Sequence, residues 1–175
     1  MDQFIVIGEV VKALGLKGEV KLYPLLNFHE AVLEGPYLVW DDGTAVEVQW
    51  HRPAGSCEAV KVSGTGDRNA AEALVGRRLG FRRESYLEPD FPRPAGGLPF
   101  RYLDREVVTV AGQAVGTVEE VRFTGAGYLL VIPDPGERGA EILIPAVVPI
   151  LQPDDGLEGP LVIDPPEGLL DVQKG

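Results

Sequence analysis

A proline- and glycine-rich segment divides this chain into two parts and limits each part to a small fold. The twelve residues from Glu88 to Pro99 contain four prolines and two glycines. Proline removes a backbone donor and glycine costs backbone entropy, so neither a helix nor a central strand is expected to cross this segment. We therefore predict a first domain at residues 1–87, a linker at 88–97 and a second domain at 98–175. Each part is long enough for a small domain.

Both parts are rich in short runs of β-branched and alternating apolar residues, which are typical of strands. In the first part these runs predict strands at 4–11, 19–23, 37–40, 45–50, 58–62 and 78–83. In the second part they predict strands at 106–110, 114–123, 128–132, 141–144 and 161–163. One short helix is predicted at 70–75, capped by Asn69, with Glu72 in the position of a capping box. Short, regularly spaced strands favour a mainly β protein built of barrels or sandwiches over a βαβ sheet.

Charge separates the two parts. The chain has a net charge of −11, which argues against a protein whose main task is to coat nucleic acid. Residues 1–95 contain 11 Lys and Arg against 14 Asp and Glu, a net charge of −3, whereas residues 96–175 contain 5 against 13, a net charge of −8. Only the first part is therefore expected to contact phosphate.

Features of secreted or membrane proteins are not visible in the sequence. A single cysteine, Cys57, excludes an intramolecular disulfide and a cysteine-rich zinc site. The longest uncharged apolar run, residues 142–151, is too short to span a bilayer and contains two prolines. We expect a monomeric, cytoplasmic protein that does not bind a membrane.

Catalytic motifs are also not visible. The spacing of His29 and His51 does not resemble a metal-binding set, and no serine lies in a Gly-x-Ser-x-Gly motif. Gly64-Thr-Gly66 lacks the third glycine of a dinucleotide fingerprint, and Asp67 would repel a phosphate there. We therefore expect no catalytic residues, no cofactor and no metal.

Two basic features are candidates for RNA binding. Lys12, Lys17 and Lys21 flank a loop in which Gly15 and Gly18 allow a close approach to a partner. The run from 77 to 83 contains four arginines around Phe81, and arginine suits both phosphates and aromatic planes. A solvated strand edge, protected by charge from aggregation, would explain the same run. The candidate RNA-binding residues are Lys12, Lys17, Lys21, Arg77 and Arg83.

At these residues the sequence resembles the RimM family of bacterial ribosome maturation factors. Ile7-Gly-Glu-Val-Val and Gly15-Leu-Lys-Gly-Glu-Val are similar to the family's N-terminal motif. Further similar segments follow in order across the chain: the helix region at 67–76, the barrel start at 106–118, and the closing motifs at 141–146 and 164–171. The ordered set is more specific than any single match.

The resemblance implies two small β-barrels in tandem, an N-terminal RimM barrel and a C-terminal PRC-type barrel. It also implies a non-enzymatic, chaperone-like factor for ribosome biogenesis that binds the immature 30S subunit near its head. Such a factor promotes folding and processing of the 3′ domain of 16S rRNA and contacts the small-subunit ribosomal protein numbered nineteen. The acidic second part suits a basic ribosomal protein.

The family's protein-binding motif departs from its usual form here. A Tyr-Tyr pair usually stands at the entrance to the second barrel, where this chain has Phe100 and Tyr102 in a different register. Together with Arg101 and Arg105 they are the candidate residues for ribosomal-protein binding. The alternative is that both aromatic side chains pack across the junction of the domains.

A different class of function also fits two small barrels. A small-molecule-binding or enzymatic protein with a pocket between its domains is the main alternative, and an accessory protein of a photosynthetic complex is a second one. The missing catalytic motifs argue against the former, and the first domain would remain unexplained in the latter.

Overall fold

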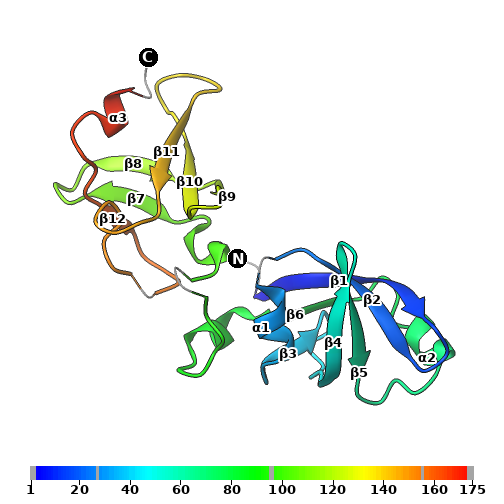
Figure 1. Ribbon diagram of the computed structural model, residues 1–175. Helices are drawn as coiled ribbons and strands as arrows, with labels where there is room; N and C mark the ends of the chain where they lie inside the picture. Colours follow the sequence, from blue (N-terminus) through cyan, green and yellow to red (C-terminus); the bar gives the residue numbers. More distant parts are fainter. Residues whose placement is uncertain (1–2, 27, 95–96, 155, 173–175) are drawn as a thin grey trace. The chain divides into compact units, whose positions relative to one another are not determined.

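The protein is mainly β and consists of two compact units, Met1–Arg93 and Pro94–Gly175 (Figure 1). The computed structural model describes residues 3–26, 28–94, 97–154 and 156–172. The first unit contains β1 (Phe4–Leu14), β2 (Glu19–Pro24), α1 (His29–Leu33), β3 (Leu38–Trp40), β4 (Val48–Ala54), β5 (Cys57–Val62), α2 (Arg68–Glu72), β6 (Arg78–Arg82) and η1 (Arg83–Leu87). The second contains η2 (Pro99–Tyr102), β7 (Glu106–Thr109), β8 (Ala114–Thr117), β9 (Glu120–Phe123), β10 (Tyr128–Pro133), β11 (Glu141–Pro145), β12 (Leu161–Ile163) and α3 (Leu169–Val172).

The first unit is one curled sheet in the order β3-β6-β1-β2-β5-β4. Residues 44–47 connect its two edges. The Val46 N–H donates a hydrogen bond to the Leu38 carbonyl at 3.0 Å, and the Ser63 N–H donates one to the Glu47 carbonyl at 2.9 Å. Both distances are typical of backbone hydrogen bonds. Inward-facing side chains from every strand but β4 form the core: Ile7, Val10, Val20, Leu22, Leu38, Trp40, Val60, Val62, Leu79 and Phe81.

Close packing of β1 against β6 requires a glycine at position 80. A Cβ atom there would lie 2.1 Å from the carbonyl oxygen of Ile5 and 2.8 Å from the ring of Phe4. The pairing of β1 with β6 also shifts register between Val6 and Gly8. Such bulges increase the local twist of a sheet, which helps a short sheet to curl.

The two helices of the first unit differ from the prediction. The α2 helix begins at Arg68, because the side chain of Asp67 accepts a hydrogen bond from the Ala70 N–H at 2.8 Å. The predicted cap at Asn69 was wrong by two residues. The α1 helix was not predicted. In the described part of the chain, no helix is long and apolar enough to cross a membrane.

The second unit is built from two three-stranded sheets, β11-β10-β9 and β12-β7-β8, in which β12 runs parallel to β7. The predicted strand 114–123 is two strands, because the chain passes from one sheet to the other at residues 118–119. The Val118 N–H donates to the Arg105 carbonyl at 3.0 Å, and the Glu119 N–H donates to the Val131 carbonyl at 2.9 Å. The core includes Val107, Val118, Leu130, Ile132, Ile144, Leu161 and Ile163.

The first six residues of the predicted linker pack onto the first unit. Phe91 is only 4% exposed, and its ring centroid lies 4.9 Å from that of Phe81, 5.3 Å from that of Tyr37 and 5.5 Å from that of Tyr86. The structure therefore divides after Arg93, six residues beyond the predicted end of the first domain. A proline-rich composition identified a segment without regular structure, but the large apolar side chain within it is buried.

We predict that a fragment of residues 1–93 folds by itself and that Phe91 is part of its core. Phe91→Ala should lower the free energy of unfolding of this fragment by about 3–5 kcal/mol, the usual cost of truncating a buried phenylalanine. Urea unfolding followed by tryptophan fluorescence measures this change. Leu87→Ala, at a side chain that is 53% exposed, is the matched control and should change stability by less than about 0.5 kcal/mol. Equal effects of the two substitutions would show that the first unit ends before Phe91.

Candidate functional site

Lys12, Lys21 and Arg52 lie in one row across the outer face of the first unit, which we call the basic row. Lys12 is paired with Lys21 across β1 and β2, and both Lys21 and Arg52 are paired with Ala59 of β5. Directly opposed residues in antiparallel strands share a face of the sheet. Lys12 and Arg52 are exposed and Lys21 is half-buried. The row therefore presents three cations along a line that crosses four strands.

An exposed aromatic side chain lies beside the basic row. Trp50 is on β4, two residues before Arg52, and is 38% exposed. The guanidinium of Arg52 lies over its ring, 5.7 Å from the centroid. Cations that follow a phosphate backbone, next to an aromatic ring on which a base can stack, are typical of surfaces that bind single-stranded nucleic acid.

Two more lysines, Lys17 and Lys61, belong to the strands and turn next to the basic row. Lys17 lies in the turn between β1 and β2 and is exposed. Lys61 is engaged with the protein itself, since its ammonium donates hydrogen bonds to the carbonyl oxygens of Lys17 and Thr65. The structure thus brings together two of the three predicted lysines, Lys12 and Lys21, and leaves Lys17 at the end of the hairpin. Sequence reasoning missed Arg52 and Trp50, because only the register of β5 with its two neighbours places them there.

The predicted arginines are less available. Arg77 is 2.8 Å from the Asp42 carboxylate and 3.3 Å from that of Asp41, and its guanidinium lies 4.7 Å from the centroid of the Trp40 ring. Arg83 is buried. The outward-facing arginines of β6 are instead Arg78 and Arg82. Arg77 has its charge balanced locally and Arg83 offers little surface to a phosphate.

Phe100 and Tyr102, the predicted protein-binding aromatics, are both buried. Both lie in η2. Tyr102 belongs to the core of the second unit, with its ring 6.4 Å from that of Tyr128 in an edge-on arrangement. These two side chains therefore contribute to the interior, and little of either is available to a partner.

Arg105 and Arg101, the predicted neighbours of those aromatics, bind the carboxylate of Asp154. Arg105 does so with two hydrogen bonds, of 2.8 Å to Oδ2 and 3.0 Å to Oδ1. Its remaining N–H groups donate to carbonyl oxygens of the same loop, those of Gly156, Glu158 and Gly159 among them. Arg101 adds one hydrogen bond of 3.0 Å to Asp154. Arg105 is buried, so this network holds the loop before β12 rather than an external partner.

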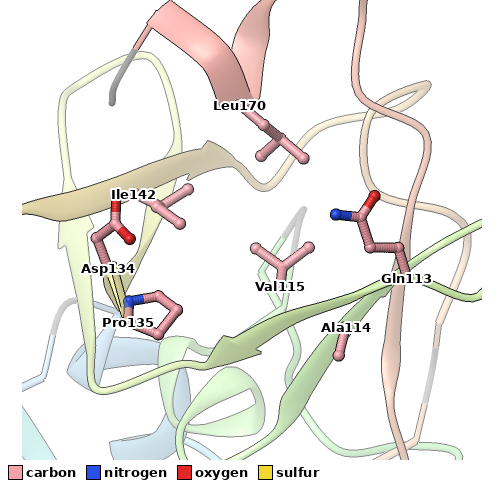
Figure 2. A pocket seen from close by; sticks show the side chains of 7 residues that line it. All are labelled: Gln113, Ala114, Val115, Asp134, Pro135, Ile142 and Leu170. Atoms are coloured by element: carbon pink, nitrogen blue, oxygen red, sulfur yellow. The ribbon is translucent and has the colours of Figure 1, made fainter. Parts of the chain in front are cut away.

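A hollow of about 200 Å³ lies within the second unit and is drawn in Figure 2. Its lining residues come from the start of β8, the end of β10, β11 and α3: Gln113, Ala114, Val115, Asp134, Pro135, Ile142 and Leu170. Asp134 is the one ionisable group among these seven, so this lining offers no acid–base pair. Its volume is below the 300–1,000 Å³ common for ligand sites.

A second group of ionisable side chains, missed in the sequence, surrounds Glu58 in the first unit. Glu58 on β5 is 3% exposed. One of its carboxylate oxygens lies 3.2 Å from His29 Nε2, and the other lies 2.8 Å from His51 Nδ1. His51 Nε2 in turn lies 3.0 Å from Glu34.

Burial opposes charge on His51, but its hydrogen bonds to Glu58 and Glu34 raise its pKa above the ordinary value. Burial acts to raise the pKa of Glu58, but hydrogen bonds from His51 and His29 outweigh it and lower that pKa.

Both units match domains of known proteins. Residues 5–86 match the RimM N-terminal domain, and residues 101–169 match the RimM PRC barrel domain. The chain belongs to the RimM family. The predicted fold, an N-terminal RimM barrel followed by a C-terminal PRC-type barrel, is therefore confirmed.

Relatives within the RimM family align over nearly the whole chain. The ribosome maturation factor RimM of Anaeromyxobacter dehalogenans is 39% identical over 172 residues, covering 94% of this chain and 96% of that protein. The ribosome maturation factor RimM of Salinispora tropica is 32% identical over 185 residues, covering 96% and 99%. A solved structure from Pseudomonas aeruginosa, described as a 16S ribosomal RNA processing protein RimM, is 23% identical with a TM-score of 0.44, covering 92% of this chain and 96% of that one.

The network around Asp154 predicts a pH dependence for the second RimM unit. Partial burial acts to raise the pKa of Asp154, but the hydrogen bonds and charges of Arg105 and Arg101 hold it below its ordinary value. A carboxyl group with a lowered pKa stabilises the fold above its unfolded pKa, about 3.9, and this contribution is lost as the pH falls through the folded pKa. Asp154→Asn should therefore destabilise the second unit at pH 7 and have a much smaller effect near pH 2.

Amide hydrogen exchange of β7 and β10 measures this change, because it reports on the second unit alone. Asp164→Asn, at an exposed position, is the control and should have little effect at either pH. A destabilisation by Asp154→Asn of the same size at both pH values would contradict the assignment.

Proposed function

We propose that this protein is a ribosome maturation factor that acts by binding the immature 30S subunit near its head, without catalysing a reaction. Family membership across both units carries the proposal, since the curated relatives that align over their full length are named ribosome maturation factors. The main alternative, an enzyme or small-molecule-binding protein, is not favoured, because it leaves this match over both units unexplained.

The mechanism follows from binding thermodynamics. A ligand shifts an equilibrium between two conformations only by its difference in affinity for them. A factor that promotes folding of the 3′ domain of 16S rRNA must therefore bind the folded arrangement of an assembly intermediate better than its misfolded alternatives. It must also bind the mature subunit more weakly, so that it is released.

The first unit is proposed to contact rRNA through the basic row. Lys12, Lys21 and Arg52 can each neutralise one phosphate, and the ring of Trp50 offers a stacking surface. A net charge of −3 over this unit makes the placement of these cations on one face more important than their number.

The second unit is proposed to contact a basic small-subunit ribosomal protein, the one numbered nineteen. The net charge of −8 over residues 96–175 would attract such a partner and orient its docking.

The buried aromatics of η2 are poor anchors, but exposed apolar side chains cluster at one end of the β9-β10-β11 sheet. These are Phe123, Val147 and Val148, which we call the apolar end; Phe123 is 53% and Val148 72% exposed. A Cβ on Gly127, which directly precedes β10, would lie 3.8 Å from the side chain of Val147, which follows β11. The start of β10 and the end of β11 therefore lie side by side.

Sedimentation tests the function as a whole. The protein should co-migrate with immature small subunits from a strain that lacks it, and should bind mature 30S subunits more weakly. Equal affinity for mature and immature subunits, or no binding to either, would contradict a maturation role.

For the basic row, we predict a change in the salt dependence of binding to immature subunits. Lys12→Ala, Lys21→Ala and Arg52→Ala together should weaken binding and reduce the slope of log K against log salt by about 0.7–0.9 for each phosphate contact that is lost. Arg78→Ala with Arg82→Ala is the control, since these arginines are exposed on β6, outside the row. An unchanged slope for the triple variant would show that the row does not meet phosphate.

For the apolar end, we predict a selective loss of protein binding. Phe123→Ser with Val148→Ser should weaken binding of the purified ribosomal protein at least tenfold, because apolar anchors contribute most of the energy of such interfaces. Val110→Ser is the matched control, since Val110 is 59% exposed after β7. Isothermal titration calorimetry measures both. Wild-type affinity in the double variant would place the partner elsewhere on the second unit.

A further inference from the structure

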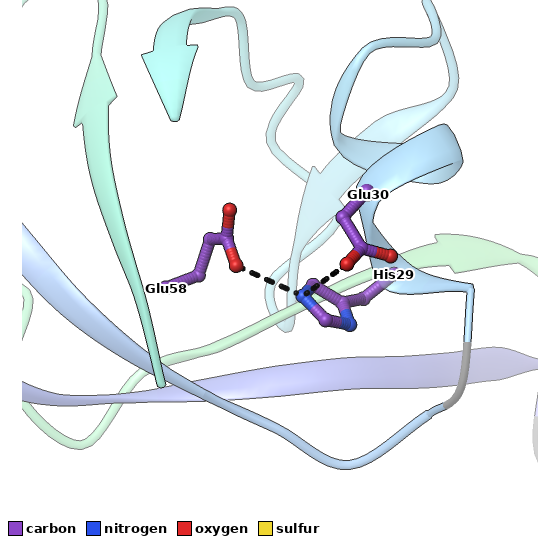
Figure 3. Close-up of side chains that lie close together, drawn as sticks. All are labelled: His29, Glu30 and Glu58. Carbon is purple, nitrogen blue, oxygen red and sulfur yellow. Dashed lines mark hydrogen bonds and ion pairs between the residues drawn. The ribbon is translucent and has the colours of Figure 1, made fainter. Parts of the chain in front are cut away.

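His29, Glu30 and Glu58 converge on one point in the first unit, although they come from α1 and β5 (Figure 3). His29 Nε2 lies 3.2 Å from Glu58 Oε2 and 3.8 Å from Glu30 Oε1. One ligand atom from each of the three residues lies within 4.8 Å of the other two. We propose that these three side chains bind a divalent transition-metal ion of the zinc class, which connects α1 to the barrel.

The spacing of the three atoms suits zinc. Zn²⁺ takes bonds of about 2.0–2.2 Å to histidine nitrogen and carboxylate oxygen in a tetrahedral arrangement, so neighbouring ligand atoms lie about 3.3–3.5 Å apart. The His29–Glu58 distance is already close to this value. The Glu30 carboxylate can move closer to the other two ligand atoms without displacing packed side chains, because its side chain is 56% exposed. Three protein ligands leave the fourth position to water.

The kind of ligand also selects the metal. One imidazole with two carboxylates suits Zn²⁺ and similar ions, whereas Mg²⁺ and Ca²⁺ prefer oxygen ligands throughout. The protein is therefore expected to distinguish Zn²⁺ from Mg²⁺.

The side chains behind the cluster resemble the supporting shell of a metal site. Glu58 would bind the metal through Oε2, while its Oε1 is held by His51 Nδ1 at 2.8 Å. His51 is oriented in turn by Glu34, at 3.0 Å from Nε2. Metal-binding side chains are commonly fixed by such outer hydrogen bonds, which set their orientation and their affinity for the metal.

The charge of the cluster favours a cation as well. Three carboxylates, of Glu30, Glu34 and Glu58, surround two histidines, and the carboxylate of Glu58 is almost completely buried. A buried carboxylate is costly unless it is paired or binds a metal. A divalent ion would balance Glu30 and Glu58 directly.

Zinc binding to the full 175-residue chain tests the proposal. The protein is treated with EDTA, dialysed and titrated with ZnCl₂ in a calorimeter, and its thermal unfolding is followed with and without the ion. We expect one saturable Zn²⁺ site and a higher Tm with Zn²⁺ but not with the same concentration of Mg²⁺, since binding to the native state stabilises it. His29→Ala should abolish binding, and Glu30→Gln should weaken it at least tenfold.

Two controls separate this site from incidental binding. Glu84→Gln removes an exposed carboxylate of the same unit, and Cys57→Ala removes the one thiol; both should bind Zn²⁺ like the wild type. Because Glu30 is exposed, Glu30→Gln should retain the fold, which far-ultraviolet circular dichroism checks. No saturable Zn²⁺ binding, or wild-type binding that survives both His29→Ala and Glu30→Gln, would overturn the proposal. Neither result would affect the proposed role in ribosome maturation.

Discussion

Both units depend on short segments that connect the edge strands of their sheets. A sheet edge exposes unpaired backbone N–H and C=O groups, and a small domain has no spare helix to cover them. In the first unit, residues 44–47 connect β3 to the strands on the far side of the sheet, through hydrogen bonds of Leu38 with Val46 and of Glu47 with Ser63. In the second, residues 118–119 continue β8 into β9 and so join two sheets of three strands. Closure leaves few helical segments and places the outer faces of the strands in contact with solvent.

The outer faces of the two barrels carry different chemistry, which agrees with the division of tasks that we propose. On the first, cross-strand pairing aligns Lys12 and Lys21 and brings Arg52 into the same row. On the second, acidic residues predominate, and the exposed apolar side chains Phe123 and Val148 mark one end of a sheet. A protein with an overall negative charge can still meet RNA if its cations are grouped, because binding depends on local phosphate contacts.

Most strands could be predicted from the sequence, because alternation along a strand is a local property. The predicted strand at 19–23 is β2 (Glu19–Pro24), and the predicted strand at 161–163 is β12. The α1 helix could not be predicted, since it begins after Phe28, which has a φ of 73° and provides no side-chain cap. Its short sequence has no local start signal, so its position depends on packing against the barrel.

The candidate sites were harder to predict than the fold. Lys12 and Lys21 were singled out because they flank a glycine-containing loop, whereas Arg52 joins them only through the register of three strands. Phe100 and Tyr102, in contrast, were predicted to bind a partner but are buried. Aromatic side chains are favoured both in cores and in interfaces, so residue type and spacing could not distinguish the two. The burial of both residues in the structure makes that distinction.

The contacts of Arg105 also bear on which substitutions this protein can accept over evolutionary time. The Arg105 guanidinium donates two hydrogen bonds to the Asp154 carboxylate and others to the carbonyl oxygens of Gly156, Glu158 and Gly159. A lysine at position 105 would keep the charge but could not supply a planar fork of donors, so it would leave several of these oxygens without a partner. Arg101 donates a hydrogen bond of 3.0 Å to the same carboxylate through Nη2, and an ammonium group could donate a similar bond. The replacement of Arg105 by lysine should therefore be selected against, although it conserves the charge.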